Sequence, residues 1–82
     1  MIGARPMDVP EFNRRAAKYL QTILADDDFN SDEANLRRLA RVLASGVGVS
    51  AGDQLAVYRT IFKYRSLVWD RDAVRFAEER KA

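Results

Sequence analysis

The sequence predicts an all-α protein, a small bundle of three to four helices that forms a single domain over residues 1–82. Three observations support this fold class. Apolar residues recur at steps of three and four along three segments, the period of a helix with one buried face. Side chains that start helices precede each of these segments. Of the 82 residues, 48% are hydrophobic and 32% charged, so the chain can fold around one core.

The first helix is expected over residues 9–25. Asp8 and Glu11 have the spacing of a capping box, in which side chains satisfy backbone N–H groups at the helix start. Pro10 is tolerated because it falls in the first turn. One face of this segment is apolar and contains Phe12, Ala16, Tyr19, Leu20 and Ile23. The residues before it, 1–7, are expected to form a flexible arm.

An acidic turn at residues 26–31 is expected to end the first helix, because short polar side chains bond to their own backbone. The second helix is expected over residues 31–45, with Asn30 or Ser31 as its N-cap. Its apolar face contains Leu36, Leu39, Ala40 and Leu43. A contiguous basic arc on the other side contains Arg37, Arg38 and Arg41.

The third helix is expected over residues 51–68, after a loop in which Gly46 ends the second helix. The two valines of that loop, Val47 and Val49, are expected to fill the core. Ser50 and Asp53 form another capping box. About half of the helical wheel is apolar, wider than the stripe of an ordinary surface helix; its members are Leu55, Val57, Tyr58, Ile61, Phe62, Tyr64, Val68 and Trp69.

Arg65 falls near the middle of this apolar half. Either its stem extends past the aromatic rings to bring the guanidinium to water, or the helix bends or ends there. A fourth helix is expected over residues 71–81, with Asp70 as its N-cap. Its few apolar side chains predict that residues 70–82 dock weakly on the rest of the domain; they are Ala73, Val74, Phe76 and Ala77.

The sequence contains no cysteine and no histidine. It therefore excludes disulfides, Cys/His zinc sites, a cysteine nucleophile and an imidazole base. The acidic turn matches the first alternating ligands of an EF-hand loop, but Ser31 replaces the required glycine and Arg37 the bidentate glutamate. We therefore expect no enzyme, no metal site and no cofactor.

A membrane partner is not expected, because no apolar run approaches the roughly 18 residues needed to span a bilayer. The first residues include no long apolar stretch of the kind found in a secretory signal. The expected location is therefore the cytoplasm.

Nucleic acid is one alternative partner. The second and third helices, joined by a short loop with glycines, are compatible with a helix-turn-helix. Such a small regulator would use the basic faces of both helices, namely Arg37, Arg38, Arg41, Arg59 and Lys63. The start of the third helix is poor in side chains that read bases, and Asp53 there would face phosphate unfavourably.

A protein partner is the leading hypothesis. Tyrosine, tryptophan and arginine, the residues enriched at interface hot spots, gather along the third helix and just after it. The expected partner-binding residues are Tyr58, Arg59, Phe62, Lys63, Arg65 and Trp69. The partner is either another protein or a second copy in a homodimer. A module of this kind suits an adaptor, an assembly factor or an inhibitor, including a phage or mobile-element anti-defence regulator such as an anti-CRISPR, although no motif specifies that role.

Overall fold

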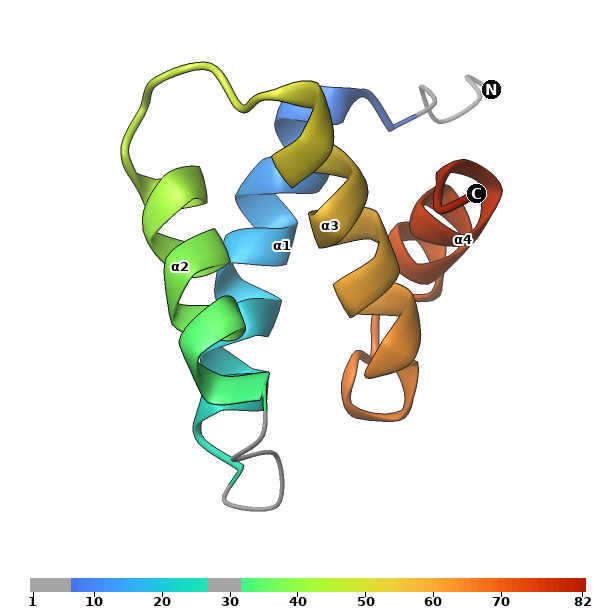
Figure 1. Cartoon of the computed structure of the whole chain (residues 1–82). Helices are drawn as coiled ribbons and strands as arrows, with labels where there is room; N and C mark the ends of the chain where they lie inside the picture. The colour runs from blue at the N-terminus through green and yellow to red at the C-terminus, as the bar shows by residue number, and fades with distance from the viewer. Residues whose placement is uncertain (1–6, 27–31) are drawn as a thin grey trace.

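The computed structural model describes residues 7–26 and 32–82, and within them the predicted all-α bundle is confirmed (Figure 1). Its α-helices are α1 (Val9–Leu24), α2 (Glu33–Ala44), α3 (Ala51–Lys63) and α4 (Arg71–Arg80). A single 3-10 turn, η2 (Arg65–Leu67), lies between α3 and α4. Figure 1 shows α1 behind and between α2 and α3, which run antiparallel to each other, with α4 on the outer side of α3.

The starts of three helices are fixed by the side chains that the sequence predicted. Asp8 accepts a hydrogen bond from the Glu11 N–H in α1, and Ser50 accepts one from the Asp53 N–H in α3. Asp70 does the same for α4. These bonds satisfy N–H groups that have no partner inside the helix.

The start of α2 differs. Asp32 occupies the N-cap position, and its side chain makes no capping bond. The expected caps, Asn30 and Ser31, lie outside the described residues. The predicted N-terminal arm also lies outside them except for Met7, which packs against the core.

Three aromatic rings join α1, α3 and α4 at the centre of the core. The ring of Phe12 stacks on Phe76 with centroids 5.0 Å apart, and Tyr58 lies 5.2 Å from Phe12 and 6.0 Å from Phe76. Leucines and isoleucines from α1, α2 and α3 fill the remainder, including Leu20, Ile23, Leu36, Leu39 and Ile61, all fully buried. Nearly all of the apolar residues that the sequence placed on helix faces contribute to this one core.

The third helix is shorter than predicted. It ends at Lys63 rather than at residue 68, and Tyr64 leaves the helical conformation with φ −102° and ψ 29°. The chain then makes the turn η2, which begins at Arg65, so the helix ends just before that residue, close to one of the alternatives expected there. The turn places Val68 in the core with 7% of its surface exposed, a position that a continued helix would have given to other residues.

The prediction for the valine loop was wrong at Val47. Gly46 has a positive φ of 77° just after α2 and so ends that helix as expected. The chain then extends away from the bundle (Figure 1), which leaves Val47 72% exposed. Val49 is half-buried.

The fourth helix buries Ala73, Phe76 and Ala77 against the core. We expect Phe76→Ala to lower the free energy of unfolding by about 3–5 kcal/mol, because it removes one ring of the aromatic cluster and leaves a cavity. Urea denaturation followed by circular dichroism measures this loss. Trp69→Ala, which removes an exposed ring, is the matched control and is expected to change stability by no more than about 0.5 kcal/mol.

The weak docking predicted for residues 70–82 stays a prediction, and the same variant tests it. If Phe76→Ala costs less than about 1 kcal/mol, well below a usual buried-ring truncation, and α4 amides exchange freely in the wild-type protein, α4 contributes little to the core.

Candidate functional site

The most exposed large apolar side chain in the described part of the chain is Trp69, at 94%. It follows η2 and precedes α4, at the corner where the chain changes direction. The residues on either side of it pack against the rest of the domain. Val68 is buried in the core, and the side chain of Asp70 is only 17% exposed. The indole therefore projects into water from a fixed backbone rather than from a loose loop.

A groove of about 420 Å³ lies beside this tryptophan. Its apolar wall includes Trp69 and Val74, and three arginines, Arg65, Arg71 and Arg75, line the remainder with a single acid, Glu78. We refer to Arg65, Trp69, Arg71, Val74 and Arg75 as the Trp69 surface. An indole and three guanidinium groups around one groove form the combination that is enriched at protein interfaces.

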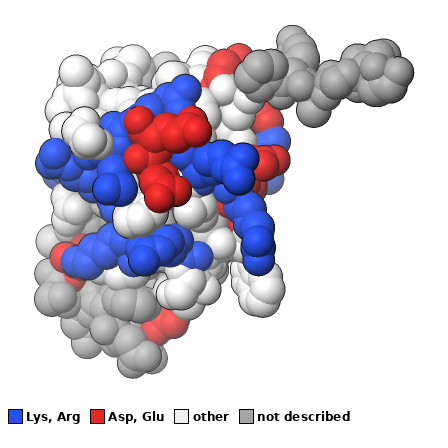
Figure 2. Space-filling view, turned by 90° about the vertical axis from the view of Figure 1, so that its right-hand side faces the viewer, with Lys and Arg blue, Asp and Glu red and all other residues white. Residues whose placement is uncertain are grey.

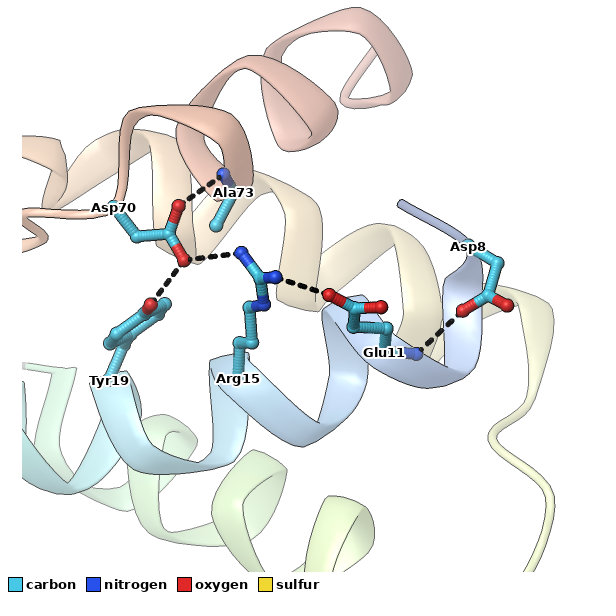
Figure 3. Close-up of polar contacts among 6 residues, drawn as sticks. All are labelled: Asp8, Glu11, Arg15, Tyr19, Asp70 and Ala73. Carbon is cyan, nitrogen blue, oxygen red and sulfur yellow. Dashed lines mark hydrogen bonds and ion pairs between the residues drawn. The ribbon is translucent and has the colours of Figure 1, made fainter. Parts of the chain in front are cut away.

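The carboxylate of Asp70 fixes this corner to α1 (Figure 3). It accepts hydrogen bonds from the Tyr19 hydroxyl and from the Arg15 guanidinium, the latter at 2.9 Å. It also caps α4 through the Ala73 N–H at 3.1 Å. Arg15 in turn pairs with Glu11 one turn earlier on α1. The backbone next to Trp69 is thus tied to two helices by one side chain.

These contacts also set the protonation of the two titratable partners. Burial alone would raise the pKa of Asp70, but the hydrogen bonds from Tyr19, Ala73 and Arg15 outweigh it and hold that pKa below its usual range. Burial, followed by the hydrogen bond to Asp70, raises the pKa of Tyr19 to about 12. At neutral pH the pair is therefore a carboxylate that accepts a hydrogen bond from a neutral phenol.

A second carboxylate ties the start of α2 to the end of α3. Asp32 accepts hydrogen bonds from the Lys63 ammonium at 2.6 Å and from the Tyr64 hydroxyl. The bond from Lys63, followed by the one from Tyr64, lowers the pKa of Asp32. Lys63, which the sequence predicted as a partner-binding residue, is engaged in this contact.

The structure places Tyr58 in the core, which corrects its assignment to a contact surface. Only 7% of it is exposed, because the aromatic cluster covers its ring. Phe62 is half-buried under the Arg65 guanidinium and the Lys81 ammonium, which lie 4.2 Å and 4.7 Å from its ring centroid. Arg59 donates to the Lys81 carbonyl at 3.0 Å. Of the residues predicted to bind a partner, Arg65 and Trp69 line the groove.

Three residues of the Trp69 surface were missed from the sequence: Arg71, Val74 and Arg75. All three lie on α4, for which the sequence predicted weak docking, although Arg71 follows the aromatic and basic residues that predicted an interface. A usable signal was present, since positions 71, 74 and 75 share one face of a helix.

On α2, two of the basic residues assigned to nucleic acid are paired with acids. Arg37 pairs with Glu33 at 2.9 Å, and Arg38 pairs with Asp53 at 2.7 Å. The bond from Arg38 lowers the pKa of Asp53 despite its partial desolvation. Arg41 is exposed on α2 beside a separate hollow between α1 and α2.

A helix-turn-helix joins two crossed helices by a turn of about three to four residues. Here residues 45–50 connect α2 to α3, and the two helices run antiparallel (Figure 1). This arrangement does not favour the helix-turn-helix form of the nucleic-acid hypothesis, which stays a prediction.

Residues 7–26 and 32–82 hold no group of acidic side chains arranged to bind a metal ion. Most of the acidic turn, residues 27–31, lies outside that part of the structure. None of the described helices is long and apolar enough to cross a membrane. Comparisons with protein-family models, with curated proteins and with solved structures found no match.

The Asp70 contacts predict an acid-sensitive contribution to stability. Because the folded pKa of Asp70 lies below its unfolded value of about 3.9, this contribution is present above that value and is lost as the pH falls through the folded pKa. We expect Asp70→Asn to be less stable than the wild type at neutral pH, and the difference to shrink in acid. Urea denaturation across a pH series measures it.

Asp72→Asn is the matched control, since it removes an exposed carboxyl from the same helix. If Asp70→Asn keeps the wild-type stability at neutral pH, the carboxylate does not hold the corner as described.

Proposed function

We propose that this chain is a non-enzymatic binding module that acts by protein–protein contact through the Trp69 surface. The observation that carries the proposal is the 94% exposure of Trp69 between two anchored residues. The proposal covers an adaptor, an assembly factor or an inhibitor, because each acts by covering a surface of another protein.

The hydrophobic effect supports a partner at this position. A tryptophan buries about 150–250 Å² when it is covered. At about 25 cal/mol per Å², covering it contributes roughly 5 kcal/mol before the costs of association. A side chain that contributes nothing to its own core has this free energy available for binding.

The anchoring of the corner supports the same proposal. Association costs free energy when loops and side chains become ordered. Val68 in the core and the Asp70 contacts already fix the backbone on both sides of the indole. A partner therefore meets a surface whose backbone is arranged before binding, which favours affinity.

The residues around the indole fit an interface better than an isolated hydrophobic side chain does. Arginine and tryptophan dominate the energetic centres of protein interfaces. Guanidinium groups also bury more readily than ammonium groups, because they are more weakly hydrated. The Trp69 surface contains arginines and no lysine.

Partner capture with matched variants tests the proposal. We expect a tagged wild-type chain to retain a specific protein from its source cells, and Trp69→Ala to lose it with a loss in affinity of at least about 2 kcal/mol, or roughly 30-fold. Val47→Ala, at a 72% exposed side chain on the far loop, is expected to retain the partner like the wild type.

Retention of the same partner by Trp69→Ala would contradict the proposal. So would a wild-type chain that retains no protein and is a monomer in light scattering. A wild-type dimer that becomes a monomer on Trp69→Ala supports the proposal, with a second copy as the partner.

A further inference from the structure

We infer that the Trp69 surface binds an acidic segment of its partner, whose Asp or Glu side chains meet Arg71 and Arg75 while an apolar side chain covers Trp69 and Val74. The inference rests on the proposed function and adds the chemistry of the partner. Its basis is the charge of the groove, the spacing of the arginines, and the acids that border them.

The groove carries more positive than negative side chains. Its three arginines share the groove with a single acid, Glu78. Within residues 7–26 and 32–82, no carboxylate forms an ion pair with Arg65, Arg71 or Arg75. Several other basic groups do pair with acids, as Arg38 does with Asp53. Carboxylates of another protein would supply the missing partners at the groove.

The spacing of the arginines suits carboxylates on a peptide. Arg71 and Arg75 are four residues apart on α4, so they lie on one face about 5–6 Å apart at their Cβ atoms. Val74 lies on the same side and lines the groove with them. Each guanidinium can bind a carboxylate through two parallel N–H donors, which also fixes its orientation.

Arg65 is held at the other edge of the groove. Its guanidinium donates to the Phe62 carbonyl at 2.9 Å and covers the Phe62 ring. Such a contact uses one N–H and one face of the group, and leaves other donors directed outward. Arg65 therefore adds positive charge at a fixed position.

The same face argues against a nucleic-acid strand as the occupant. A strand needs a continuous basic track for its phosphates. On the α4 side of the molecule, Figure 2 shows acidic side chains between two groups of basic ones. The exposed acids of α4 are Asp72, Glu78 and Glu79. A short acidic segment needs no such track, because Arg71 and Arg75 are one turn apart on α4.

Selection of displayed random peptides tests the inference. Peptides that bind the wild-type protein are kept, and those that also bind Trp69→Ala are discarded. We expect the retained peptides to be enriched in Asp and Glu relative to the starting library. Because Trp69 is the only tryptophan of the chain, its fluorescence then reports binding of each synthetic peptide directly. We expect affinity to fall as salt is added and when glutamine replaces the acids.

Two double variants of equal charge change localise the effect. We expect Arg71→Glu with Arg75→Glu to weaken the selected peptides by at least about tenfold, because like charges then face each other. Arg37→Glu with Arg41→Glu makes the same change on α2, at the same spacing, and is expected to leave the affinity within about twofold, the level of a distant surface charge. Circular dichroism checks that both variants are folded.

Each contrary result identifies what has failed. Enrichment of neutral or basic peptides overturns the acidic partner and leaves the proposed function standing. Equal loss in both double variants overturns the assignment to Arg71 and Arg75. Tighter binding of a single-stranded oligothymidylate than of any peptide, reported by Trp69, overturns the acidic segment in favour of nucleic acid. If no peptide distinguishes wild type from Trp69→Ala, the acidic segment is overturned, and partner capture decides the proposed function separately.

Discussion

The carboxylate of Asp70 holds the start of α4 against α1, and the exposed corner of this domain depends on that contact. This one side chain caps α4 through the Ala73 N–H, accepts a hydrogen bond from the Tyr19 hydroxyl and forms an ion pair with Arg15. In a chain of 82 residues with no cysteine, no disulfide can do this work. The aromatic cluster of Phe12, Tyr58 and Phe76 then buries α4 from the other side. Together these contacts fix the backbone on both sides of Trp69, whose side chain is exposed to water.

The charged residues of the chain serve two purposes that are separated in space. Three carboxylates that pair with a basic group join elements: Asp70 joins α4 to α1, Asp32 joins α2 to the end of α3, and Asp53 joins α3 to α2. Such contacts on a surface are individually weak, but each is combined with a helix cap or a tyrosine. Around Trp69 the arginines have no such internal use in the described residues. Together with the exposure of Trp69, this difference, rather than the net charge of +2, supports the proposal that a partner binds there.

The fold was readable from the sequence because its determinants are local. Asp8, Ser50 and Asp70 are the N-caps of three helices, and the helical spacing of the apolar residues identifies most of the core. The site was only partly readable. Tyr58 and Trp69 look alike in a hydrophobic pattern, yet the early end of α3 at Lys63 sends one inward and the other outward. That end lies beside a contact between Tyr64 and Asp32, residues 32 positions apart, which has no signature in neighbouring residues. Arg71 and Arg75 line one groove with Trp69 because of how α4 packs, and the sequence alone does not show that packing.

The central claim is that another protein covers the indole of Trp69. The most direct measurement places a photo-crosslinking phenylalanine derivative at position 69 in the source cells and, as a control, at Val47. We expect a crosslinked product with one protein at position 69 under ultraviolet light and none at position 47. No product at position 69, the same products at both positions, or a product with nucleic acid alone would contradict it.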